Sequence, residues 1–196
     1  MKAISLLETT LSEHADALAV SDLTFEGSAH LVSRILFSNL FAKLGEQNAR
    51  IREATEDILL QMAGYTRLIG PTAVLSYATK IAIESDTKPK TAIGKLQLVH
   101  KILERHAHQL QDQQQLAQTV SFSKGGFKHQ SNEVRGQSFH VILECYKTMG
   151  RDIKVHLSGL RIAQQEMLEK GFNKIDIERG PGHFTDGQAP SIQATA

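Results

Sequence analysis

A faint internal repeat constrains the fold of this 196-residue chain more than any other feature of its sequence. Segments 44–52 and 127–135 match at their apolar, Gln, small-polar, Ile/Val and Arg positions. Halfway between them, a polar loop leads into another apolar helix start, so that Ile51, Ile93 and Val134 are 42 and 41 residues apart. This spacing is within the period of about 40–47 residues that is typical of repeated helix pairs.

Apolar residues recur at three- and four-residue steps along almost the whole chain, which indicates amphipathic helices. The stripes predict about eight helices, and the clearest lie within 4–18, 31–44, 48–64, 71–84, 93–110, 134–150 and a final pair over 153–172. The segment around Val120 and Phe122 is short and weak and ends at Gly125-Gly126. The glutamines near 113–115 are expected to form a solvated helix face or a linker.

One helix pair cannot bury its apolar stripe alone, so neighbouring pairs stack and share a continuous core. We therefore predict an all-α fold, an α-solenoid of stacked antiparallel helix pairs of the HEAT type, over residues 1–178. Residues 179–196 have almost no apolar periodicity and are predicted to be a disordered tail. In this array, the turns within pairs line one edge, and the turns between pairs line the other.

The turns within pairs carry the candidate binding residues, and we call the surface that they form the turn edge. Its predicted members are Gln47, Asn48, Arg50, Lys88, Lys90, Lys128, His129 and Asn132. The second helix of each pair points its N-terminus, with unpaired N–H donors, at this edge. The carboxylates of Glu46, Glu84, Asp86 and Glu133 also lie near it, so the predicted surface is mildly basic rather than a dense basic patch.

The charge balance and the targeting signals exclude several classes of protein. The chain has 22 basic residues (Lys and Arg) and 21 acidic ones (Asp and Glu), whereas a general nucleic-acid binder usually carries a large basic excess. No apolar run approaches the roughly 18 residues that span a bilayer, and Glu8 interrupts the N-terminus before a signal peptide could form. We expect a soluble, cytoplasmic protein that binds neither nucleic acid nor membrane.

Catalytic and metal-binding patterns are absent from the sequence. It contains no Walker loop, no Gly-x-Ser-x-Gly motif and no dinucleotide fingerprint. His100, His106 and His108 lack the i, i+4 spacing of zinc helices. The single cysteine, Cys145, lies on an apolar helix and is expected to be a buried small hydrophobe. We therefore predict that the chain is not an enzyme and needs no cofactor or metal.

The run Asn48-Ala-Arg50-Ile51-Arg52-Glu53-Ala54, which follows a helix and a polar turn, resembles the TOG domains. These are HEAT-repeat arrays that bind tubulin heterodimers through their intra-repeat turns. The stretches 131–135 and 141–150 fit the same pattern. The region 134–176, including its final segment 169–176, is most similar to the centrosomal, ciliary-tip TOG protein family. The likeness extends over about residues 3–176.

The resemblance implies a module that binds αβ-tubulin or microtubule ends, in a cytoskeletal protein of the centrosome, centriole or cilium tip. Other centrosomal or ciliary proteins are possible further partners. The resemblance makes Gln47, Asn48 and Arg50 second-turn contacts, Lys88 and Lys90 third-turn contacts, and Lys128, His129 and Asn132 fourth-turn contacts. The first-turn Trp of many TOG domains has no counterpart, because the chain contains no tryptophan. Either the chain starts after that position or the domain lacks this anchor.

Two alternatives stay open. The first is a HEAT-repeat scaffold that binds another protein, such as a kinase or a coiled-coil partner, through the opposite edge or the glutamine-rich helix. The second concerns Arg52 and Arg135, which could be binding residues but are expected to have a structural role, in an internal ladder with acidic neighbours.

Overall fold

The computed structural model describes residues 36–65, 69–83, 88–110 and 112–180, and this part of the chain is helical, with no strand. The α-helices are α3 (Ser38–Lys43), α4 (Ala49–Gly64), α5 (Gly70–Thr79), α6 (Pro89–His106), α7 (Gln113–Gly126), α8 (Asn132–Met149) and α9 (Ile162–Arg179), and the 3-10 helices include η3 (Ala107–Gln109) and η4 (Gly150–Leu157). The all-α prediction is confirmed. The predicted helix at 4–18 and nearly all of the predicted tail lie outside the described residues.

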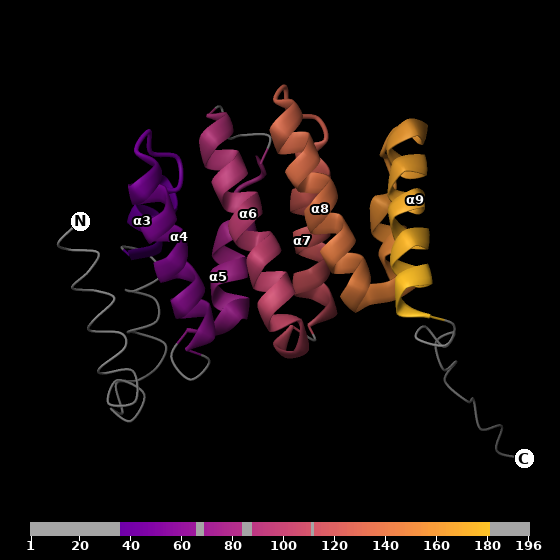
Figure 1. The fold of residues 1–196 in the computed structure, drawn as a ribbon, viewed down its shortest axis with the longest axis horizontal. Coiled ribbons are helices and arrows are strands. Elements are labelled where there is room, and N and C mark those ends of the chain that lie inside the picture. Colours follow the sequence, from indigo (N-terminus) through magenta and orange to yellow (C-terminus); the bar gives the residue numbers. More distant parts are fainter. Residues whose placement is uncertain (1–35, 66–68, 84–87, 111, 181–196) are drawn as a thin grey trace, which may run out of the picture.

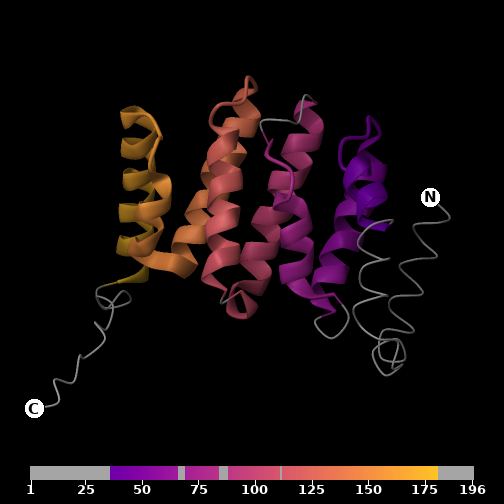
Figure 2. The ribbon, with the colours of Figure 1, turned by 180° about the vertical axis from the view of Figure 1, so that it is seen from behind.

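In the described part of the chain, the helices form three antiparallel α-helix pairs, α3–α4, α5–α6 and α7–α8, and a last pair made of the 3-10 helix η4 and α9; all stack side by side in two layers. Figure 1 shows the pairs in chain order, from α3–α4 at one end to η4–α9 at the other, and Figure 2 shows the same order from behind. In one layer α4 contacts α6, α6 contacts α8 and α8 contacts α9; in the other, α5 contacts α7 and α7 contacts η4. This is the predicted α-solenoid.

A continuous apolar core fills the space between the layers, and aromatic contacts reinforce it towards both ends. At the α3 end, the ring of Tyr77 lies 5.2 Å from that of Phe37 and 5.0 Å from that of Phe41. At the other end, the rings of Tyr146 on α8 and Phe172 on α9 stack at 4.1 Å with an interplanar angle of 14°. Both Tyr146 and Phe172 are buried.

Helix α7 is longer and more regular than its sequence predicted. Asp112 caps it by accepting a hydrogen bond from the backbone N–H of Gln114 at 2.9 Å, and α7 then continues for 14 residues. Its buried face carries Gln115, Thr119 and Ser123, whose polarity hides the helical period. The hydroxyls of Thr119 and Ser123 each donate a hydrogen bond of 2.9 Å to the backbone carbonyl four residues earlier, so neither is left without a partner.

Two helix ends also differ from prediction, and so does the exposure of the glutamine-rich segment. Helix α5 ends at Thr79, before the predicted end at residue 84. Helix α6 ends at His106 and passes into η3, which leaves Leu110 buried in the turn rather than on a helix. The glutamine-rich segment is also not wholly solvated, because the buried Gln115 accepts a hydrogen bond from the Ser76 hydroxyl at 2.5 Å.

Gly94 allows α6 to pack closely against the turn that follows α3. A Cβ atom at Gly94 would lie 2.9 Å from the backbone oxygen of Leu44 and 3.0 Å from its Cβ. The Leu44 side chain is buried, so the helix pairs α3–α4 and α5–α6 meet here without room for adjustment. A side chain at position 94 would force these two pairs apart.

We expect Gly94→Ala to lower the free energy of unfolding by about 1–3 kcal/mol, the usual cost of overpacking. The matched control is Gly136→Ala on α8, where a Cβ meets no atom within 4 Å. That substitution should raise stability by about 0.5–1 kcal/mol, because Ala favours a helix over Gly. Thermal unfolding followed by far-UV circular dichroism measures both. Equal effects of the two substitutions would contradict the close packing at Gly94.

Candidate functional site

The turns within helix pairs lie along one edge of the solenoid (Figure 1). The predicted binding residues of the turn edge lie on these turns or in the first turn of the helix that follows. The described residues of this edge are 44–50, 88–90, 127–132 and 158–161. Seven of the eight predicted side chains are exposed, and only His129 is half-buried. Of the four predicted carboxylates, Glu84 and Asp86 lie outside the described residues.

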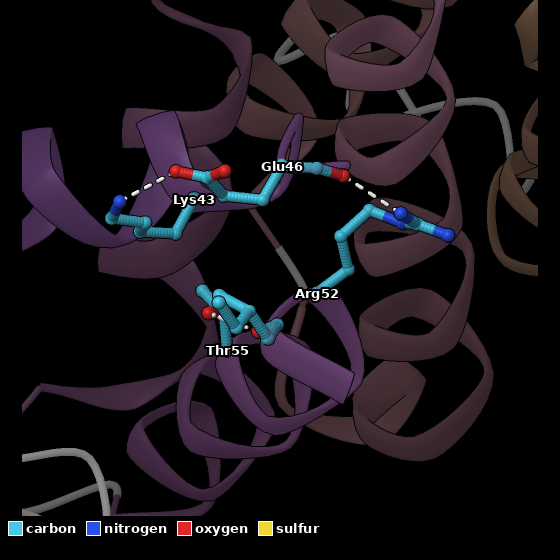
Figure 3. Close-up of polar contacts among 5 residues, drawn as sticks. Lys43, Glu46, Arg52 and Thr55 are labelled. Carbon is cyan, nitrogen blue, oxygen red and sulfur yellow. Dashed lines mark hydrogen bonds and ion pairs between the residues drawn. The ribbon is translucent and has the colours of Figure 1, made fainter. Parts of the chain in front are cut away.

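The α3–α4 turn is shaped by two side chains with structural roles. Asn48 caps α4, as its sequence position predicts, and its Oδ1 accepts the backbone N–H of Arg50 at 3.0 Å. Arg52 points back at the turn, where its Nη1 donates to the backbone oxygen of Glu46 at 2.7 Å (Figure 3). The same Nη1 donates to the backbone oxygen of Gln47 at 2.9 Å. The guanidinium therefore ties the start of α4 to the turn that precedes it.

The α7–α8 turn repeats this arrangement at the matching position. Arg135 Nη1 donates to the backbone oxygens of His129 at 2.7 Å and Gln130 at 2.8 Å, again six and five residues earlier. We call each of these arrangements an arginine clamp. The expected structural role is thus supported, but the expected acidic partners are replaced by turn carbonyls. At the corresponding position of the α5–α6 pair the residue is Gly94, so that pair has no clamp of this kind.

His129 also shapes its own turn. Its Nδ1 accepts the backbone N–H of Ser131 at 3.0 Å. The side chain of Ser131, at the N-cap of α8, makes no capping hydrogen bond, and the imidazole accepts the N–H of the N-cap residue itself, as a Glu or Gln at N3 does in a capping box. This contact explains why His129 is the least exposed of the predicted binding residues.

Neighbouring turns are also connected through their exposed side chains. The Lys90 ammonium on α6 donates to the side-chain oxygen of Gln47 in the α3–α4 turn. In the same turn, Glu46 pairs with Lys43 at 2.5 Å. This hydrogen bond, the charge of Lys43 and, to a smaller extent, the charge of Lys88 lower the pKa of Glu46. The carboxylate thus stays ionised and offsets part of the positive charge at this end of the turn edge.

Two grooves open between the turns, and they differ in charge. The smaller has a volume of about 280 Å³ and lies between α4, α6 and the start of α8; its lining includes Arg52 and Lys90 but also Glu53, Glu56 and Glu133. Glu56 further pairs with Lys101 at 2.7 Å. The larger has a volume of about 950 Å³ and lies between the α7–α8 turn and the turn from η4 to α9.

The larger groove adds two cations that the sequence analysis missed, Lys124 and Arg161. Lys124 lies one helical turn before Lys128, at the end of the helix that the sequence predicted only weakly. Arg161 follows Ser158-Gly159, where Gly159 has a φ of +83° that glycine adopts readily. That Ser-Gly turn just before an apolar helix was the signal that could have identified a fourth turn of this edge.

The remaining candidate chemistry gives no further site. Across the described residues, no group of three or more His, Cys, Asp or Glu side chains is placed to hold a metal ion. His100 instead lies 3.6 Å from Glu144, which also pairs with Lys147 at 2.5 Å. Cys145 is buried, and this burial, followed by the charge of Glu144, raises the pKa of its thiol, which keeps it unreactive. None of the described helices is both long enough and apolar enough to cross a bilayer.

Comparison with known proteins gives one family and three informative structures. The model of the XMAP215/Dis1/CLASP TOG domain matches residues 8–172. The solved TOG domain of human Cep104 superposes with a TM-score of 0.69 at 20% identity, over 88% of this chain and 66% of that one. A second solved CEP104 TOG domain superposes with a TM-score of 0.68 at 18% identity, over 87% of this chain and 66% of that one.

The N-terminal domain of MAST/Orbit gives a TM-score of 0.63 at 17% identity, over 75% of this chain and 63% of that one. The chain thus spans slightly less than two thirds of the length of these solved structures, and at these identities the likeness concerns the fold. No curated protein matches the chain in sequence.

Proposed function

Because the chain belongs to the XMAP215/Dis1/CLASP TOG-domain family, we propose that it binds αβ-tubulin through its turn edge. The contacts that we propose are Gln47, Asn48 and Arg50 on the first described turn, Lys88 and Lys90 on the next, and Lys128, His129 and Asn132 on the third. The module has a binding role and no catalytic one.

The observation that carries this proposal is the pair of arginine clamps. Arg52 and Arg135 hold two turns of the same edge in the same way, which positions exposed polar and cationic side chains before any partner binds. A preformed surface loses little conformational entropy on binding. Its spaced cations suit an acidic protein surface such as that of tubulin, where they would contribute association rate and orientation more than raw affinity.

We further propose that the chain is part of a protein of microtubule ends, centrioles or the cilium tip. The fold likeness to the TOG domain of human Cep104 supports this placement. Other centrosomal or ciliary proteins are further candidate partners of such a protein.

Co-elution of the purified chain with soluble tubulin in size-exclusion chromatography tests the proposal. We expect a complex at low ionic strength that weakens as salt is added, because exposed charges are screened over about 10 Å at 0.1 M salt. The absence of a complex at low salt would contradict the proposal. Capture of a kinase or a coiled-coil protein without tubulin would favour the scaffold alternative instead.

The combined substitution Lys88→Glu with Lys90→Glu should weaken tubulin binding by about tenfold or more, because two attractive contacts become repulsive. The helical circular dichroism spectrum should not change, since both side chains are exposed. The matched control, Lys170→Glu with Lys174→Glu, makes the same charge change on exposed positions of α9, away from the turn edge. Binding as tight as that of the parent chain would show that these turns are not the tubulin-binding surface.

A further inference from the structure

We propose that the larger groove, between the α7–α8 turn and the turn from η4 to α9, binds an acidic linear peptide segment. Its cationic side chains are Lys124, Lys128, Arg135 and Arg161, with His129 beside them, and of the described residues that line it none is Asp or Glu. The inference goes beyond the proposed function, because it concerns an extended segment and does not require that the segment belong to tubulin.

The way in which two of these cations are held keeps their charge available. Lys124 Nζ donates to the backbone oxygens of His156 at 3.1 Å and Ser158 at 3.0 Å, and Arg135 donates to two carbonyls of its own turn. Carbonyl partners satisfy the donors and fix the side chains, but they carry no net charge. These two side chains therefore keep their contribution to the positive potential of the groove, whereas carboxylate partners would cancel it.

The backbone contributes charges of both signs. Helices α8 and α9 begin beside the groove with the partial positive charge of a helix N-terminus, whereas α7 ends there with a partial negative charge, so the side chains determine the sign of the potential. The acidic residue in the first turn of α8, Glu133, lines the smaller groove and not this one. The two grooves of the same edge thus differ in the charge of the ligand that they favour.

Size and composition favour a peptide over other anions. A volume of about 950 Å³ is at the upper end of the roughly 300–1,000 Å³ of ligand pockets, far more than one phosphate ion needs. Sites for single-stranded nucleic acid combine cations with exposed aromatic rings on which bases stack. Of the described residues that line this groove, Phe127 is the only Phe, Tyr or Trp, and it is only 5% exposed.

Fluorescence anisotropy with a labelled octaglutamate peptide at low salt tests this inference on the full chain. We expect saturable binding that weakens with salt, and no binding of octaglutamine. Arg161→Glu and Lys128→Glu, both at exposed positions, should each weaken octaglutamate binding by about tenfold. The matched control Lys170→Glu, outside the groove, should change it less than twofold.

Three results would overturn the inference: no binding of octaglutamate, equal loss of binding in the Lys170→Glu control, or tighter binding of a uridine oligonucleotide through the same residues. The outcome is separable from that of the tubulin experiment. A chain that binds octaglutamate but not tubulin would contradict the proposed function and support the peptide groove.

Discussion

Replacing Tyr146 with Ala should increase the hydrogen-exchange rates of the α9 amides by roughly a hundredfold or more. The ring of Tyr146 is 1% exposed and stacks on Phe172, so its loss leaves a cavity between α8 and α9. Truncation of a buried aromatic ring costs about 3–5 kcal/mol, and about 1.4 kcal/mol corresponds to a tenfold change in an equilibrium constant. Each pair of a solenoid contacts only its neighbours, so this cost falls first on the last pair.

The conservative variant Tyr146→Phe separates the ring from its hydroxyl. The hydroxyl donates to the carboxylate of Asp176, with both oxygens at 2.9 Å. Burial and this carboxylate raise the pKa of Tyr146 to about 12, so the hydroxyl stays protonated and able to donate at neutral pH. We expect Tyr146→Phe to cost only about 1 kcal/mol, the usual net value of one hydrogen bond.

Exchange measured by mass spectrometry on peptides from α4 and α9 distinguishes a local from a global effect. Peptides from α4, at the far end of the solenoid, should exchange as in the parent chain. If the α9 amides exchanged as slowly in the Tyr146→Ala variant as in the Tyr146→Phe variant, the stacked rings would not be the contact that holds α9 against α8.

Loss of an arginine clamp should lower both stability and binding. Arg135→Met keeps the aliphatic part of the side chain but removes two hydrogen bonds from a charged donor to the carbonyls of His129 and Gln130. Hydrogen bonds to charged groups contribute about 1.5–3 kcal/mol each, and the partial exposure of this pair favours the lower values, so we expect a total cost of about 2–3 kcal/mol. Arg52→Met should behave in the same way at the α3–α4 turn.

The matched control is Arg105→Met, which removes an exposed guanidinium at the end of α6. Urea unfolding followed by circular dichroism, together with tubulin co-elution, gives the two readouts. We expect the Arg135 variant to lose stability and to bind tubulin more weakly, because its turn is no longer held in the binding conformation. If Arg135→Met and Arg105→Met unfolded at the same urea concentration, Arg135 would not stabilise its turn.

Much of the fold could be predicted because its signals are local. Apolar residues at three- and four-residue steps predicted the helices, and Asn48 predicted the start of α4, since a cap acts within its own helical turn. Helix α7 was underestimated because Gln115, Thr119 and Ser123 lie on its buried face and satisfy their polar groups within the protein. Hydropathy alone cannot distinguish such a face from a solvated one.

The candidate site, like the fold, could be predicted from the sequence only in part. The repeat of Arg52 and Arg135 in matching positions was visible in the sequence, and so was the edge on which their turns lie. Their actual partners were not, because a backbone carbonyl in a turn has no sequence signature. The cations Lys124 and Arg161 were missed for a related reason: they come from different helix pairs and meet only after those pairs have stacked.

By itself, the sequence determined that this protein is a stack of helix pairs with polar turns along one edge. Helical period, capping and repeat spacing are relations between residues close in the chain or one period apart. Only the tertiary structure decided that arginine clamps hold two of those turns, that Gly94 brings neighbouring pairs into close contact, and that one groove is cationic while the other contains carboxylates. Each of these depends on distances across the turns or between helix pairs, and packing sets those distances.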